Sequence, residues 1–137
     1  MSQYMLLVYE EELDQAGQAE REKVTPTLVE LHASLREAGL LIGVQRLRST
    51  QSATSIRVRD GQTELTDGPF AVTKEVLAGY YILECADLDE ALRLAARMPM
   101  ARWGTVEVRP VVSPDEWVSI AREAGVDVPD EAVEELA

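Results

Sequence analysis

The distribution of apolar and polar residues predicts both strands and helices in this chain. Four segments have the apolar content of β-strands: residues 3–10, 40–47, 79–86 and 105–112. Residues 25–39 and 87–98 instead repeat apolar residues every three or four positions, as an amphipathic helix does. Between the second and third strands lies Asp60-Gly61, the dipeptide that a two-residue β-hairpin turn favours, with a short strand on either side.

This order of elements predicts an α+β fold. Two strand-helix-strand units, with their helices on one side of a mostly antiparallel sheet, make a ferredoxin-like sandwich with an inserted β-hairpin. Strands 3–10 and 79–86 are apolar on both faces; in the first, Leu6 and Val8 share one face while Met5 and Leu7 share the other. Because the helices cover only one face, we expect a second copy of the chain to cover the other, in a symmetric homodimer.

The predicted helices carry signals at their ends. Thr25 is a candidate N-cap with Pro26 in the first turn, and Gly39 is a suitable C-terminal stop. Asp87 is the candidate N-cap of the second helix. The expected buried stripe of that helix consists of Leu88, Ala91, Leu92 and Ala95.

The last 25 residues differ in character from the core. Ser113 and Glu116 form a capping-box pattern, and the helix that follows has an apolar stripe consisting of Trp117, Ile120, Ala121 and Ala124. Residues 113–137 contain eight acidic residues and one basic residue, Arg122. We therefore divide the chain into a core of residues 1–112 and an acidic helical appendage of residues 113–137. We expect Trp117 to pack on the core or on a partner subunit.

Composition narrows the class of protein. The formal net charge of -12 argues against direct binding of nucleic acid, whose phosphates would be repelled. No apolar run approaches the ~20 residues that a membrane helix needs, and no signal peptide is recognisable. The single cysteine, Cys85, excludes a disulfide within the chain. We expect a cytoplasmic protein.

Common catalytic motifs are missing from the sequence. There is one histidine, His32, and Cys85 has no companion at the spacing of metal ligands, so neither a metal nor a cofactor is expected. A glycine-rich phosphate loop and a nucleophile elbow are also missing. His32 lies at the flank of its helix's apolar stripe, and the simplest interpretation is a half-exposed side chain without a role.

Charged residues on apolar strands are the remaining candidates for a site. Glu84 lies on the third long strand, and Glu107 and Arg109 share one face of the last. Glu107 and Arg109 form either a ligand-binding pair or a cross-strand or intersubunit ion pair, and the sequence does not decide between these alternatives. Asp67 begins a turn in which Pro69 lacks the N–H that an aspartate usually binds, so its carboxylate either reaches the loop beyond or faces a cleft.

One long stretch resembles a known family. "TDGPFAVTKEVLAGYYILECADLDEALRLAARMP", with "YMLLVYE" before it and "GTVEVRPV" after it, resembles the DGPF-type branch of the YCII-related family over residues 3–112. The resemblance implies a ferredoxin-like subunit in a dimeric α/β barrel. It also implies a structural signature, formed by Asp67, Gly68, Pro69 and Phe70, with weaker companions at Lys74, Glu75, Glu107 and Arg109. The histidine of the wider group's histidine-aspartate pair corresponds to Leu28 here.

Two hypotheses for function follow. In the first, a homodimer binds a small polar metabolite between sheet and hairpin, with or without transforming it. Asp67 is then the candidate acid/base or a ligand acceptor, and the candidate ligand-binding residues are Arg109, Glu107, Lys74 and Glu84. In the second, the protein is a non-catalytic interaction module that binds a protein partner through the helix around Trp117. The resemblance links that role to transcription, because DGPF-type genes often neighbour those of extracytoplasmic-function sigma factors.

Overall fold

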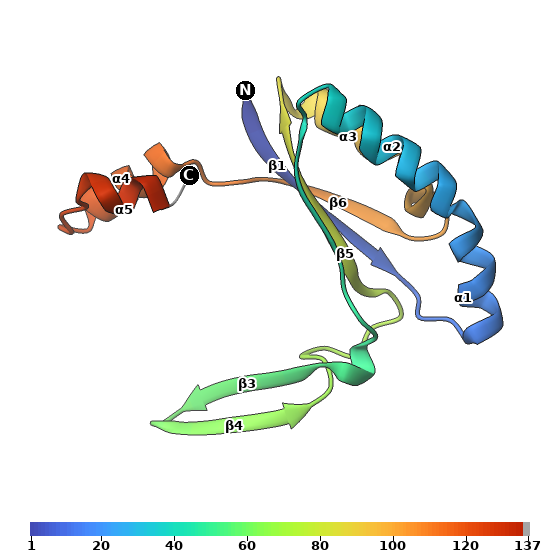
Figure 1. The fold of residues 1–137 in the computed structure, drawn as a ribbon. Helices are drawn as coiled ribbons and strands as arrows, with labels where there is room; N and C mark the ends of the chain where they lie inside the picture. The colour runs from blue at the N-terminus through green and yellow to red at the C-terminus, as the bar shows by residue number, and fades with distance from the viewer. Residues whose placement is uncertain (136–137) are drawn as a thin grey trace.

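The computed structural model describes residues 1–135 and has the α+β architecture that the sequence predicts (Figure 1). Its main sheet is antiparallel, with the strand order β2-β5-β1-β6. These strands are β1 (Ser2–Glu10), β2 (Leu41–Arg46), β5 (Val76–Cys85) and β6 (Thr105–Pro110). This is the order of a ferredoxin-like fold, with β1 and β5 at the centre.

Helices cover one face of this sheet, and no layer formed by residues 1–135 covers the opposite face (Figure 1). The helices on the covered face are α1 (Gln15–Arg21), α2 (Thr25–Glu37) and α3 (Leu88–Ala96), with 3-10 turns η1 (Glu22–Val24) and η3 (Pro99–Arg102). Leu6, Leu35, Leu83 and Met98 are fully buried between the two layers. Within residues 1–135, no helix has the length and apolar character that crossing a membrane requires.

The local signals at the helix ends are only partly correct. The Asp87 carboxylate accepts from the N–H of Glu90 at 2.8 Å, as an N-cap should. Thr25 is not an N-cap, because η1 runs into α2 without a break and the Thr25 hydroxyl donates to the carbonyl of Glu22 at 2.6 Å. Gly39 follows the end of α2 with a φ of +74°, the left-handed conformation that glycine favours.

The predicted apolar stripe of α3 is partly wrong. Ala91 and Ala95 are buried as expected, but Leu88 and Leu92 are 45% and 47% exposed. Leu94 is buried in their place. The helix therefore turns a neighbouring face to the sheet, where Leu94 joins the core that Leu6 and Leu83 fill.

Two segments project from the core on its uncovered side (Figure 1). The hairpin consists of β3 (Thr54–Arg59) and β4 (Gln62–Asp67), which form a separate two-stranded sheet after the 3-10 turn η2 (Thr50–Ser52). Its turn is confirmed, since Asp60 and Gly61 have φ of 51° and 74°.

The second projecting segment is the C-terminal tail, with α4 (Pro114–Glu123) and α5 (Asp130–Glu135). The Ser113 hydroxyl accepts from the N–H of Glu116 at 3.1 Å, so the predicted N-cap is confirmed. Trp117 is 51% exposed and the tail stands away from the sheet, so the core of its own chain is not the surface on which Trp117 packs (Figure 1). In α4 only Val118 is buried.

Candidate functional site

A mainly apolar pocket lies between the sheet and the segment from α1 to α2. Its volume is about 160 Å³, and its wall combines apolar side chains such as Val8, Leu28 and Met100 with a few polar groups. A concave, mainly apolar space with a few convergent polar groups is the usual form of a small-molecule site. It lies on the helix-covered face of the sheet, away from the hairpin.

One hydrogen-bonded pair marks the inner wall of this pocket. Nε2 of His32 and the hydroxyl oxygen of Tyr81 are 2.7 Å apart, and the two rings meet edge to face with centroids 5.3 Å apart. His32 comes from α2, one position after the buried Leu31, so it borders the seam between helix and sheet. Tyr81 comes from β5, where it is opposite Leu6 of β1 in the register and only 4% exposed.

Burial keeps both members of this pair uncharged near neutral pH. Burial raises the pKa of Tyr81 to about 12. Burial also lowers the pKa of His32 below its ordinary value of 6.5, with a smaller contribution from the Arg36 charge. In one tautomer the Tyr81 hydroxyl donates to Nε2, and in the other Nε2–H donates to the hydroxyl. The pair can therefore exchange donor and acceptor roles toward a bound group without creating a charge.

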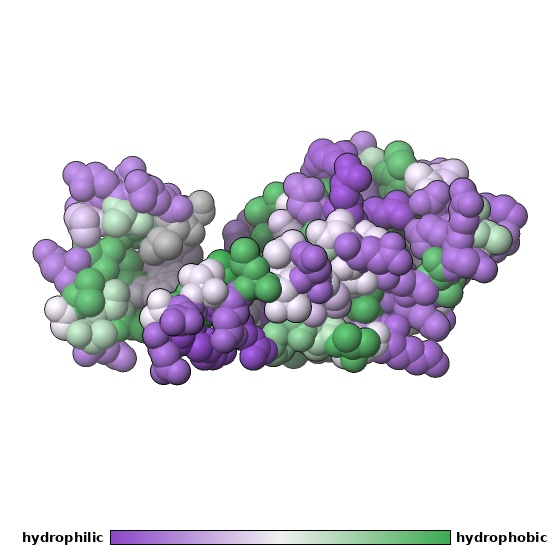
Figure 2. Space-filling view, turned by 90° about the horizontal axis from the view of Figure 1, so that it is seen from below, coloured by the Kyte–Doolittle hydropathy of each residue, from purple (hydrophilic) through white to green (hydrophobic). Residues whose placement is uncertain are grey.

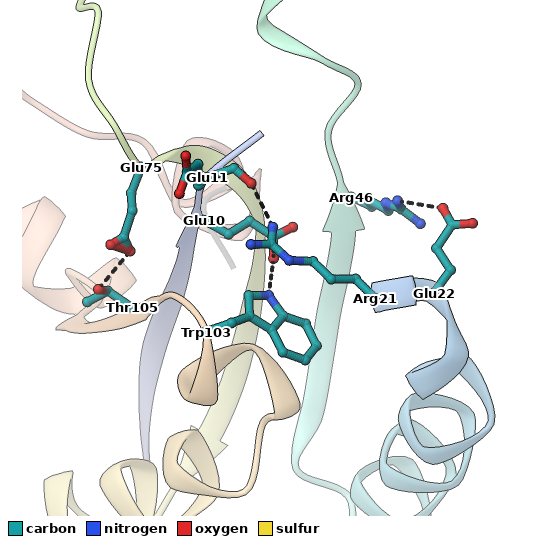
Figure 3. A network of polar contacts seen from close by, with 8 residues as sticks. All are labelled: Glu10, Glu11, Arg21, Glu22, Arg46, Glu75, Trp103 and Thr105. Atoms are coloured by element: carbon teal, nitrogen blue, oxygen red, sulfur yellow. Dashed lines mark hydrogen bonds and ion pairs between the residues drawn. The ribbon is translucent and has the colours of Figure 1, made fainter. Parts of the chain in front are cut away.

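A second polar cluster forms the rim of the pocket (Figure 3). The indole N–H of Trp103 donates to the Glu10 carboxylate at 2.6 Å, and Nη1 of Arg21 lies 3.8 Å from the same carboxylate oxygen. Arg21 also donates to the main-chain oxygen of Glu11 at 2.6 Å and lies over the Trp103 ring, 5.6 Å from its centroid. The side chains of Arg21 and Glu10 are only 15% and 20% exposed, so they hold the rim in one geometry.

The charges at the rim are balanced. Arg21 is paired with Glu10, and on the β2 side Arg46 donates to Glu22 at 3.1 Å (Figure 3). The second pair is well exposed and contributes little to stability. With neutral His32 inside, the pocket thus offers polar contacts without a net charge.

A larger and more polar groove adjoins the pocket where β1 leaves the sheet. Its volume is about 830 Å³, and it shares Glu10 and Arg46 with the pocket. Nearby, the Glu12 carboxylate accepts from the N–H and the hydroxyl of Thr50 at 2.6 and 2.8 Å. These bonds lower the pKa of Glu12, the main-chain one most, and tie the base of the hairpin to the end of β1.

The turn around Asp67 is held by backbone contacts instead of by its carboxylate. The Gly68 N–H donates to the Ala53 carbonyl at 2.8 Å, and the Ser55 hydroxyl donates to the Gly68 carbonyl at 2.9 Å. Gly68 has a φ of +106°, which favours glycine. The Asp67 side chain is exposed and makes no hydrogen bond to any residue from 1 to 135.

Phe70, the last residue of the signature, does not anchor this turn in the core. It is 75% exposed, and the guanidinium carbon of Arg57 lies 4.8 Å from its ring centroid. Lys74 borders a separate hollow of about 250 Å³ beside the same loop, together with Pro69 and Glu12. This part of the predicted site therefore lies by the hairpin and not at the pocket.

The charged residues on the strands lie on the main sheet, apart from the hairpin that carries Asp67 (Figure 1). Arg109 donates to Glu107 within the same strand, β6, so this contact differs from the predicted alternative of a cross-strand or intersubunit ion pair. Glu84 is opposite Gln3 in the register of β1 and β5. The fold thus joins Glu107 to Arg109 but does not bring either to Asp67.

Sequence reasoning missed the residues that this pocket brings together. The simplest interpretation of the sequence gives His32 no role. No motif in the sequence points to the other four residues, which are Glu10, Arg21, Tyr81 and Trp103. One signal was available: a histidine beside the apolar stripe of a helix that packs on a strand containing a polar aromatic. The partners are 49 residues apart for His32 and Tyr81, so no local motif joins them.

Two comparisons with known proteins match most of this chain. The model of the YCII-related domain matches residues 2–117. An uncharacterized protein of Rhizobium meliloti (strain 1021) is 40% identical over 112 residues, which cover 79% of this chain and 90% of that protein. The match includes every strand of the main sheet and the residues that line the pocket. The chain belongs to the YCII-related domain family.

Proposed function

We propose that this protein binds a small polar metabolite in the pocket under α2, where His32 and Tyr81 contact the polar group of the ligand. The observation that carries the proposal is the 2.7 Å contact between these two side chains in the wall of a mainly apolar pocket. Binding of a small polar metabolite is the function that the sequence predicts. The site that we propose for it lies on the helix-covered face of the sheet and not at the hairpin.

The volume and charge of the pocket restrict the ligand. A volume of about 160 Å³ is close to the ~150 Å³ of an engineered cavity that holds benzene, so one ring or a short branched chain fills it. The rim pair Arg21–Glu10 is already neutral, and burial keeps His32 and Tyr81 uncharged. We therefore infer an uncharged ligand with one hydroxyl or carbonyl group.

The pair also suits proton exchange with such a group. A neutral imidazole accepts a proton, and a tyrosine with a pKa of about 12 donates a hydrogen bond without ionising. His32 is therefore the candidate base, and Tyr81 is the group that positions it. If the protein transforms its ligand, acid/base chemistry at the hydroxyl or carbonyl is the class of reaction that these residues support.

Phenol is a suitable probe, because it has one ring and one hydroxyl group. In an NMR titration we expect phenol to shift amide signals of α2 and β5 in the wild type and in the control Tyr9→Phe, which removes a tyrosine hydroxyl from a residue that does not line the pocket. In Tyr81→Phe and His32→Ala we expect affinity to fall by about tenfold, the effect of one hydrogen bond. Equal affinity in all four proteins contradicts the proposal.

Three finer predictions from the sequence accompany this proposal. The run Asp67-Gly68-Pro69-Phe70 supports membership of the DGPF-type branch. The uncovered face of the sheet supports a dimeric barrel (Figure 1). The acid/base role of Asp67 has less support, because its carboxylate lies on the hairpin. In Asp67→Asn we expect unchanged binding of phenol, and a loss of binding would return the site to the hairpin.

The alternative function, an interaction module linked to sigma-factor-dependent transcription, has one observation in its favour. Trp117 is half exposed on a tail that projects from the core. Deletion of residues 113–137 should then abolish binding of a protein partner while the remaining domain keeps its thermal transition. Unfolding of the truncated protein would instead give the tail a structural role.

A further inference from the structure

The hairpin and the C-terminal tail both lie on the side of the molecule to which the uncovered face of the sheet points (Figure 1). The helices cover only one face of the main sheet. On the other side the hairpin projects from one end of the sheet and the C-terminal tail projects from the opposite end. Each of these three surfaces carries apolar side chains that nothing in the described chain covers.

The centre of the uncovered face, on β1 and β5, is apolar, and charged side chains lie around it: Glu107 and Arg109 of β6 are opposite Leu7 and Met5, and Glu84 is opposite Gln3. Met5 and Leu7 of β1 lie beside Ile82 and Tyr80 of β5, their partners in the register. All four are partly exposed, whereas the side chains that alternate with them are buried under the helices. An antiparallel sheet with one solvated face normally carries polar side chains there. This face therefore resembles one half of an interface.

The tail presents a second apolar surface. Trp117 and Ile120 are 51% and 50% exposed on α4, and Val126 beyond it is 54% exposed. Viewed from below, the tail is a separate lobe with hydrophobic surface exposed on it (Figure 2). A tryptophan buries a large area when it is covered, and aromatic anchors of this kind are enriched at protein interfaces.

The hairpin presents the third apolar surface. Ile56 and Val58 lie on one side of β3, and Leu65 of β4 is opposite Ile56 in the register. Their exposed fractions are 65%, 58% and 68%. A two-stranded hairpin is marginally stable without a partner for its apolar side. The other side of β3 carries Arg57 and Arg59.

Opposite charges on the tail and the hairpin indicate that these two surfaces bind each other. The tail carries eight acidic residues and only Arg122 as a base. Among residues 1–135, no ion pair forms with Arg57, with Arg59 or with any acid of the tail. The tail and the hairpin of one chain project from opposite ends of the sheet, so they do not meet within the chain (Figure 1). In a two-fold dimer, the tail of one chain can reach the hairpin of the other.

We propose that the tail of this protein docks on the hairpin of a second copy of the same chain, and that the two uncovered sheet faces lie between the two arms. Trp117 and Ile120 cover the apolar side formed by Ile56, Val58 and Leu65. The acidic residues of the tail lie near Arg57 and Arg59, whose long side chains extend past the edges of the ribbon. The contact occurs twice, once for each tail. It is independent of the ligand pocket, which lies on the other face of the sheet.

The two arms allow a complementation test. Trp117→Glu removes the docking side chain from the tail, and Ile56→Asp removes the docking surface from the hairpin. Both positions are exposed in the single chain, so each variant should keep the wild-type circular dichroism spectrum. In sedimentation velocity we expect a wild-type dimer and, for each variant alone, a dissociation constant raised by at least about tenfold, as for a central aromatic anchor.

Mixing the two variants should restore dimers. In the mixed dimer, the chain with Ile56→Asp has an unchanged tail, and the chain with Trp117→Glu has an unchanged hairpin. One of the two contacts therefore forms without a substitution. The control is Val29→Asp, which changes a side chain that is 61% exposed on α2, within the helix layer. It should dimerise like the wild type, because it lies outside the proposed contact.

The charges provide a second measurement. Salt should weaken the wild-type dimer by screening. Arg57→Glu with Arg59→Glu should also weaken it, and Glu116→Lys with Glu123→Lys in the same chain should restore part of the loss. A wild-type monomer at high protein concentration, unchanged dimers in both single variants, or no gain on mixing would each overturn the proposal. A monomer would indicate that the arms bind a different protein.

Discussion

Removal of the Tyr81 hydroxyl group tests the hydrogen bond between His32 and Tyr81 in the pocket. In Tyr81→Phe the ring stays in place, but His32 loses the partner that lies 2.7 Å from its Nε2. A hydrogen bond of this kind contributes about 1 kcal/mol, and a buried nitrogen left unpaired costs ~1–3 kcal/mol. Because His32 is only half-buried, water replaces part of the lost contact. We therefore expect the free energy of unfolding to fall by about 1 kcal/mol.

Urea denaturation at pH 7.5 measures this change. The matched control is Tyr80→Phe, which removes the same atom from the next residue of β5 on the uncovered face of the sheet. No hydrogen bond from the Tyr80 hydroxyl is formed within residues 1–135, so its loss should change stability by less than about 0.5 kcal/mol. The double variant of Tyr81→Phe with His32→Ala should then reveal a coupling of about 1 kcal/mol between the two residues.

Two results would refute this reasoning. Equal destabilisation by Tyr81→Phe and Tyr80→Phe would mean that the bond to His32 adds nothing to stability. Additive effects in the double variant would mean that the two side chains act independently, and the pocket would then lack the unit on which the proposed function rests.

Other predictions concern pH and backbone packing. NMR titration of His32, the only histidine in the sequence, should give a pKa below 6.5. Because unfolding raises the pKa of His32, the free energy of unfolding should fall as pH drops below about 6.5. His32→Ala should remove this pH dependence. Gly79→Ala should destabilise the sheet by more than about 2 kcal/mol, because the new Cβ would lie 2.5 Å from a main-chain oxygen of β2. In contrast, Gly43→Ala meets no atom within 4 Å and should change stability far less in the same urea assay. Glu12→Gln should speed hydrogen exchange at the Thr50 amide, and in the wild type this protection should weaken as pH falls through the lowered pKa of Glu12.

Local chemistry explains what was predicted correctly from the sequence. Asp87 and Ser113 cap their helices, and Asp60-Gly61 forms the hairpin turn, because each acts on backbone groups within a few residues. The two faces of β1 follow from the alternation of side chains in any extended strand. The order of such elements then leaves few ways to build a layered sheet.

Predictions from local sequence patterns are wrong where packing against neighbouring elements determines the structure. Thr25 has the composition of an N-cap, but the preceding 3-10 turn continues into its helix. Leu88 and Leu92 have the spacing of a buried stripe, yet α3 turns Leu94 to the sheet. In both cases the local pattern does not decide the outcome, because packing against the rest of the chain determines where the helix begins and which face is buried.

The candidate site depends on tertiary structure most of all. By itself the sequence determined the α+β order of elements, the hairpin and the acidic tail. Only the fold placed His32 against Tyr81, which lies 49 residues further along the chain, and Trp103 against Glu10, which lies 93 residues earlier. Such pairs have no local signature, because the free energy that brings their elements together comes from burying the apolar side chains between the helices and the sheet.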